Sequence, residues 1–427
     1  HGDEVLVQAL RQEPTLGSLI DPDGTHPEYI AKGFEECGPL STPIPSGWLA
    51  EYDQLPTEEF DRYGVLPIDQ FQPPPDDVRR RGGRTVYEGL RLLISRGIRQ
   101  KGTDKGKIAA RLESKSFCFK DSIHGIRLID GNEERGKLLL GILWSSLTRY
   151  YLWMTSGHWT AWHPEVKKEL LSRIPIRLPK NDRLRGKVIR AVDKLRSVDT
   201  VANDLYAPKG IRSKLQIDRE IGKLETELDE AIFDLYELTD AERDVVHDMC
   251  DVGLELFYRG TKSDAVKPVS DLDDRPSIGR RGDLPQKRTA QQGLDGYLDA
   301  FLEIWDAEVG PSGQFRWRVI RPSDSSPMLA VVFSTEDTDD RLPPPADSDD
   351  AAWSVLLKKF FRTSLHPFGS KRIYIDGMTR IVGENDIAII KRNERRLWTR
   401  TAAREDAEAT QLNAVHKQRA LARERAV

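Results

Sequence analysis

Charge is divided along this chain into opposed blocks, and that division limits how its N-terminal part can fold. Residues 1–78 hold 16 acidic and three basic side chains, whereas residues 79–127 hold 14 basic and four acidic ones. Like charges at this density repel one another unless a surface of opposite charge lies against them. We therefore expect the acidic segment to wrap another surface. The basic segment is where a polyanion would sit, unless it only balances the acidic segment within the chain.

Composition excludes several classes of protein. Charged residues make up 31 % of the chain and hydrophobic residues 38 %, the latter below the roughly 45–50 % usual for globular domains. There is no run of about 18 apolar residues and no signal-peptide pattern, so we expect no membrane partner. The distant cysteines Cys37, Cys118 and Cys250 form no disulfide framework, and no Cys or His spacing matches a zinc site. These features favour a cytoplasmic protein.

Residue patterning predicts an α+β fold. Short apolar runs punctuated by glycine at 90–94, 108–112, 116–119 and 123–129 predict strands, and apolar residues at helical spacing predict a helix at 134–155. A further helix is expected at 164–171, and Thr239 with Glu242 fits a capping box. The segments expected are an acidic irregular lead-in at 1–84, a β-rich unit with a central helix at 85–180, a helical hairpin or bundle at 181–261, a linker at 262–293, a small α+β module at 294–404 and a charged tail at 405–427.

Complete catalytic motifs are absent from the sequence. It contains no phosphate-binding loop of the Gly-x-x-x-x-Gly-Lys-Ser/Thr type, no Gly-x-Ser-x-Gly elbow and no His-Glu-x-x-His pair. We therefore assign no catalytic, cofactor-binding or metal-binding residue. One alternative is a nuclease site in the C-terminal module, where Asp376, Glu384 and Asp386 surround predicted hairpins without a lysine in register.

Two basic stretches flank the predicted central helix and are the candidate DNA-binding residues. In the first, glycines let the loops approach a duplex backbone, and Arg or Lys can neutralise phosphates or bond guanine. In the second, residues 165–196 hold 11 basic and four acidic side chains. The alternative is a basic surface that contacts an acidic partner or solvent. The candidates in these stretches are Arg96, Arg99, Lys101, Lys105, Lys107, Arg111, Lys167 and Lys168. His158 and Trp159, where the chain is expected to leave the central helix, are added because such side chains suit contact with a base or sugar.

Residues from about 90 to 260 resemble the target-recognition, C-terminal region of a family of large N6-adenine DNA methyltransferases. These enzymes belong to type IIG restriction-modification and related phage-defence systems. The resemblance is carried by LLISRG at 92–97, IAAR at 108–111, FCF at 117–119, SIHG at 122–125, LLGILWSSL at 139–147, YYL at 150–152, LSRIPIRLP at 171–179 and LETELDEAI at 224–232.

The family's catalytic half has a glycine-rich S-adenosylmethionine loop and an Asn-Pro-Pro-Tyr-type motif, and neither occurs in this sequence. The resemblance therefore implies a recognition subunit or fragment that binds double-stranded DNA. S-adenosylmethionine and methylation would belong to a catalytic domain or subunit outside this chain. An alternative is a non-enzymatic scaffold that binds other proteins of a defence system.

Overall fold

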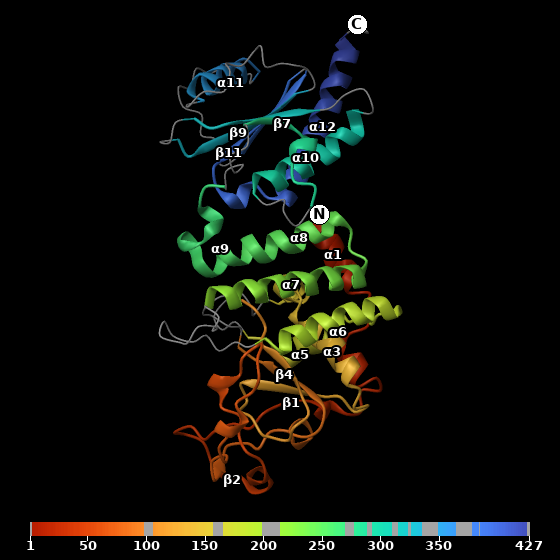
Figure 1. The fold of residues 1–427 in the computed structure, drawn as a ribbon, viewed down its shortest axis with the longest axis vertical. Helices are drawn as coiled ribbons and strands as arrows, with labels where there is room; N and C mark the ends of the chain where they lie inside the picture. Colours follow the sequence, from red (N-terminus) through yellow and green to blue (C-terminus); the bar gives the residue numbers. More distant parts are fainter. Residues whose placement is uncertain are drawn as a thin grey trace. The chain divides into compact units, whose positions relative to one another are not determined.

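A computed structural model of the chain describes residues 2–97, 106–156, 165–198, 214–269, 277–287, 293–309, 315–322, 326–334, 349–363, 378–383 and 385–424. The chain divides into two compact units, unit 1 at residues 1–250 and unit 2 at residues 251–427. Colours in Figure 1 run from red to green through unit 1 and from green to blue through unit 2. Within the described ranges, every helix is too short or too polar to cross a bilayer.

Unit 1 combines an antiparallel sheet with a group of helices (Figure 1). Its elements are α1 (Gly2–Leu10), α2 (Leu16–Ile20), β1 (Ile30–Lys32), β2 (Ile44–Pro45), β3 (Asp77–Val78), β4 (Arg91–Ser95), β5 (Ala110–Glu113), β6 (Ile123–Arg127), α3 (Glu133–Trp144), α4 (Ser146–Thr155), α5 (Lys168–Ser172), α6 (Asp182–Arg196), α7 (Lys214–Tyr236), α8 (Asp240–Asp248) and the π-helical turn η7 (Met249–Gly253) that crosses its end.

The acidic lead-in is part of the unit 1 fold, although we expected it to be irregular. Its strand β1 extends the sheet to the order β1-β6-β4-β5, with Lys32 opposite His124. Its carboxylates Glu35 and Glu36 pair with Arg79 and Lys120. The segment thus wraps the chain's own basic surface, which relieves the repulsion between its charges.

The helix expected at 134–155 is two helices that meet at Ser145. The Ser145 hydroxyl accepts a hydrogen bond from the Thr148 amide and caps α4. The Asp229 side chain on α7 accepts hydrogen bonds from both the amide (2.7 Å) and the hydroxyl (2.6 Å) of Ser146. Together these acceptors satisfy amides that a new helix start leaves free, so the chain turns here.

Helices α6 and α7 pack antiparallel, as two ion pairs show. Lys187 pairs with Asp234, and Lys194, further along α6, pairs with Glu227, which is earlier on α7. Helix α3 lies against both at Gly141. A Cβ atom on that glycine would lie 2.9 Å from Val188 Cγ1 on α6. The missing side chain therefore lets the helices approach closely.

Unit 2 is a five-stranded antiparallel sheet in the order β10-β11-β9-β8-β7. Its core side chains place α10 and α12 on one face and α11 on the other (Figure 1). The elements are α9 (Leu254–Arg259), β7 (Ile278–Arg280), α10 (Leu294–Val309), β8 (Arg316–Ile320), β9 (Met328–Ser334), α11 (Asp350–Thr363), β10 (Met378–Val382), β11 (Asp386–Arg392) and α12 (Arg400–Glu424). The α+β fold class predicted from the sequence is confirmed.

Two expected boundaries differ in unit 2. The segment expected as a linker supplies the edge strand β7 and the buried side chains Val269 and Leu284. The expected tail is continuous with α12, whose Ala403, Asp406 and Ala407 are buried. Only a few side chains of each segment enter the core, so both segments have a mostly polar sequence. Their composition therefore did not indicate that they belong to the folded unit.

Candidate nucleic-acid interface

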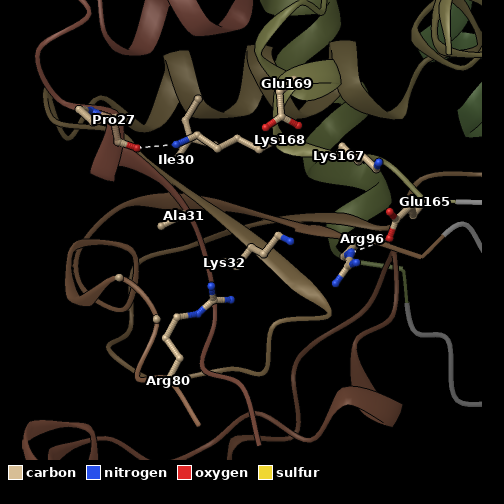
Figure 2. A pocket seen from close by; sticks show the side chains of 12 residues that line it. Pro27, Ile30, Ala31, Lys32, Arg80, Arg96, Glu165, Lys167, Lys168 and Glu169 are labelled. Carbon is tan, nitrogen blue, oxygen red and sulfur yellow. Dashed lines mark hydrogen bonds and ion pairs between the residues drawn. The ribbon is translucent and has the colours of Figure 1, made fainter. Parts of the chain in front are cut away.

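An open hollow of about 690 Å³ lies on unit 1 and gathers residues from four separate parts of the chain. Its lining holds five cationic side chains and two carboxylates, and Pro27, Ile30 and Ala31 add apolar surface (Figure 2). We call it the basic hollow, and its lining residues are Pro27, Ile30, Ala31, Lys32, Arg80, Gly82, Gly83, Arg96, Glu165, Lys167, Lys168 and Glu169.

Strand β1 carries Lys32 into the basic hollow. The side chain of Lys32 is partly exposed, and within the described ranges it has no hydrogen-bond or ion-pair partner. A lysine placed among other cations without a carboxylate of its own favours an anion from outside.

Two glycines allow the segment that follows β3 to run against β1. Gly82 has a φ of +73°, and a Cβ atom there would lie 2.4 Å from the Tyr87 hydroxyl oxygen. A Cβ on Gly83 would come within 2.7 Å of the Ala31 Cβ. This close approach brings Arg80 to the hollow, where its Nη2 lies 3.4 Å from Glu35 Oε2 and its side chain stays 56 % exposed.

Arg96 follows β4 and is held by two carboxylates. Its Nε lies 2.7 Å from Glu165 Oε2, and its Nη1 lies 3.3 Å from Asp121 Oδ2. The Val166 amide donates to the Arg96 carbonyl at 2.8 Å, and Gly97 forms a β-bridge with Glu165. Burial raises the pKa of Glu165, but the nearby cations, chiefly Arg96, outweigh burial and lower that pKa below its ordinary value.

Helix α5 and the residue before it supply the remaining charges. Lys168 Nζ donates to the Pro27 carbonyl at 2.7 Å, which joins α5 to the turn before β1 (Figure 2). Lys167 is the N-cap residue of α5. Glu169 is exposed and, as far as the described chain goes, has no bonded partner.

His124 lies opposite Lys32 on β6 and adds no charge. Its Nε2 is 3.0 Å from the Val166 carbonyl oxygen, a geometry in which Nε2 donates. Burial, together with Lys32 and Arg96, lowers the pKa of His124 to about 4. The ring is therefore neutral at pH 7, and the cations of the hollow are its lysines and arginines.

Three of the predicted DNA-binding residues meet in the basic hollow: Arg96, Lys167 and Lys168. Two others do not. Lys107 bonds both carboxylate oxygens of Glu225, at 2.9 and 2.7 Å. Arg111 is buried. Their side chains are only 20 % and 9 % exposed, less than that of Arg96, and they do not line the hollow, so they are not part of the interface.

Arg111 donates to three carbonyl groups of the lead-in: Asp61 at 3.0 Å, Tyr63 at 3.3 Å and Gly64 at 2.7 Å. The sequence analysis predicted that Arg111 would contact DNA. No sequence pattern shows that three backbone carbonyls of a distant segment surround its guanidinium. The candidates Arg99, Lys101, Lys105, His158 and Trp159 lie outside the described residues.

Lys32 and Arg80 were missed by the sequence analysis. Each had a recognisable feature. Lys32 is one of three basic residues among the first 78, and Arg80 sits in an Arg-Arg-Arg-Gly-Gly run.

The described residues contain no group of three or more His, Cys, Asp or Glu side chains placed to hold a metal ion. Of the carboxylates considered for a nuclease, Asp376 and Glu384 lie outside the described ranges, and Asp386 begins β11. Neither a protein-family model nor a curated protein matches this chain.

Proposed function

We propose that this chain is the DNA target-recognition subunit or fragment of an N6-adenine DNA methyltransferase in a restriction-modification or phage-defence system. The observation that supports the proposal is the basic hollow, in which Arg96, Lys167 and Lys168 join Lys32 and Arg80 on an open surface. The resemblance in sequence supplies the enzyme class.

The charge of the hollow suits the backbone of a duplex. Its five cations exceed its two carboxylates by three. DNA binding gains free energy when cations replace the counterions condensed on the phosphates. Arginine bonds a phosphate with two donors, and lysine contributes a point charge.

Phosphate contacts position a protein on DNA but do not read its sequence. In this proposal, base reading falls to Arg99, Lys101, Lys105, His158 and Trp159. A catalytic domain or subunit outside this chain holds S-adenosylmethionine and flips the target adenine out of the stack. That catalytic part and other defence-system proteins are the proposed protein partners.

The test measures the affinity of the full chain for a fluorescent mixed-sequence duplex over a series of salt concentrations. The double variant Lys32→Ala, Arg80→Ala removes two phosphate contacts, so affinity falls at least ~10-fold and the salt slope decreases by about two. Lys115→Ala is the matched control. Lys115 is an exposed lysine of the same basic stretch that does not line the hollow.

Binding that is indifferent to salt, or equal losses in the control and the double variant, contradicts the proposal. A stably co-purifying protein combined with no DNA binding favours the scaffold alternative.

A further inference from the structure

The carboxylates of the basic hollow are placed unequally. Glu165 lies 2.7 Å from Arg96, whereas Glu169, in the same hollow, is exposed and has no partner within the described chain. The Glu165 carboxylate thus takes up one of the two arginines that the proposed function assigns to phosphates. A chain built only to attract DNA would gain by leaving Arg96 uncommitted.

We propose that Glu165 is a specificity-determining residue that occupies Arg96 in the unbound chain and is displaced from it by a DNA phosphate. The proposal rests on the proposed function and names a regulation of the same site. Any polyanion that uses Arg96 must first break this pair, so binding without further contacts is disfavoured.

The pair is suited to exchange. The side chains of Arg96 and Glu165 are 31 % and 21 % exposed, so water reaches both. Partly exposed pairs are weak compared with fully buried ones. Within the described chain, the side-chain hydrogen bonds of Arg96 use Nε and Nη1, and Nη2 forms none.

The backbone can stay in place while the side chains separate. The Val166 amide bonds the Arg96 carbonyl at 2.8 Å, and the Gly97–Glu165 bridge lies beside it. These bonds hold the two segments together without the ion pair. Lys32 and Lys167 also lower the pKa of Glu165, so the displaced carboxylate remains among cations.

The experiment compares Glu165→Gln with Glu169→Gln in the full chain, using the mixed-sequence fluorescent duplex. Each variant removes one negative charge from the same hollow, but only the first breaks the shorter of the two ion pairs of Arg96 and leaves it with Asp121 alone. We expect Glu165→Gln to bind about fivefold to tenfold more tightly, and Glu169→Gln to change affinity by no more than about twofold.

The salt dependence separates exchange from a merely structural role. In the unmodified chain, a phosphate that takes Arg96 leaves Glu165 in need of another cation, so one fewer ion is released overall. Glu165→Gln therefore steepens the slope of log affinity against log salt by about one. If Glu165 acts through Arg96, its replacement in a chain that already carries Arg96→Ala changes affinity by no more than the roughly twofold expected from losing one charge.

A thermal melt checks that each variant is folded. If Glu165→Gln does not fold, Glu165→Asp decides instead, because its shorter carboxylate loosens the contact with Arg96 and is expected to give a smaller gain of the same sign. Equal affinities for Glu165→Gln and Glu169→Gln overturn this inference, as does a fivefold or larger gain that persists with Arg96→Ala. In both cases the losses with Lys32→Ala, Arg80→Ala leave the proposed function standing. If no form of the chain shows salt-dependent binding, both fall.

Discussion

Two sets of cationic side chains from the basic stretch of unit 1 differ in where they point and in how exposed they are. Arg91, Lys107 and Arg111 point into the protein, where carbonyl oxygens and carboxylates surround them. Arg80 and Arg96 line the basic hollow, where their side chains are 56 % and 31 % exposed. The difference shows that a surplus of positive charge is not by itself a binding surface. The nearby oxygens decide which cations remain available to an outside anion.

The inward set joins the acidic lead-in and the neighbouring loops to the sheet. Arg91 donates to the carbonyls of Gly89 (2.9 Å) and Lys115 (2.6 Å), and its guanidinium lies 4.5 Å from the centre of the Phe117 ring. Burial lowers the pKa of Arg91 to about 10, so it stays charged at pH 7. Such side chains are costly to replace, because their oxygen partners would then be buried without donors.

The largest expected effect comes from Arg111→Met, which keeps the side-chain volume and removes every donor. Three lead-in carbonyls lose their partner at about 1 kcal/mol each, so the free energy of unfolding falls by about 3 kcal/mol. Urea denaturation measures this loss. The affinity of the folded fraction for DNA stays unchanged.

Arg80→Met is the matched control from the hollow. It is expected to change the free energy of unfolding by less than about 0.5 kcal/mol, because Arg80 makes an exposed pair, and to weaken DNA binding. If Arg111→Met weakened DNA binding without loss of stability, the division into inward and outward cations would be wrong.

The second prediction concerns Glu225, the carboxylate that holds the inward Lys107. Its Oε1 also accepts from the Tyr63 hydroxyl at 2.8 Å, and Arg62 Nη1 lies 3.4 Å away. Glu225→Gln keeps the shape but leaves two cations without a counter-charge, so the free energy of unfolding at pH 7 falls by about 2 kcal/mol. The surface pair of Glu227 with Lys194 provides the control, and Glu227→Gln is expected to cost less than about 0.5 kcal/mol.

The Glu225 effect depends on pH with a defined sign. Burial raises the pKa of Glu225, but Arg62 and Lys107 outweigh burial and bring it below the ordinary value of 4.5. A lowered pKa stabilises the folded state above the unfolded pKa, and that stabilisation is lost as the pH falls through the folded value. The difference between the unmodified chain and Glu225→Gln should therefore shrink below pH 4.5. A difference that is constant down to acid pH would argue against the ion pair as its cause.

Local patterns account for much of the fold. The capping box of Thr239 and Glu242 is confirmed at the start of α8, because both of its hydrogen bonds are present. The apolar stripe of α7 is largely buried, as its period indicates. The break at Ser145 could not be predicted in this way, since it depends on Asp229, 83 residues from Ser146. The pairing of β1 with β6 likewise depends on a contact distant in sequence.

The basic hollow was predictable only in part, for the same reason. Arg96, Lys167 and Lys168 stand in conspicuously basic stretches, and the structure brings them together. Lys32 stands alone in an acidic segment and reaches the hollow only through the β1–β6 pairing. Lys107 and Arg111 lie in an equally basic stretch but meet oxygen atoms of distant segments. Composition reports how much charge a segment carries, whereas exposure depends on tertiary contacts.

The smallest expected effect tests whether a buried carboxylate that forms no ion pair within the described chain, Asp229, behaves differently from Glu225. Burial raises the pKa of Asp229 to about 6, although the hydrogen bonds from Ser146 oppose the shift. A raised carboxyl pKa means that the ionised form destabilises the folded state above pH 6, and that this cost declines as the pH falls from 6 towards the unfolded value of 3.8.

Asp229→Asn keeps an acceptor for the Ser146 amide and carries no charge. We therefore expect it to be about 1 kcal/mol more stable than the unmodified chain at pH 7.5, with the advantage shrinking by pH 5. Urea denaturation at the two pH values measures both differences. A variant less stable at pH 7.5 would show that the ionised carboxylate, like Glu225, is a net stabilising group and that the helix start at Ser146 requires its charge.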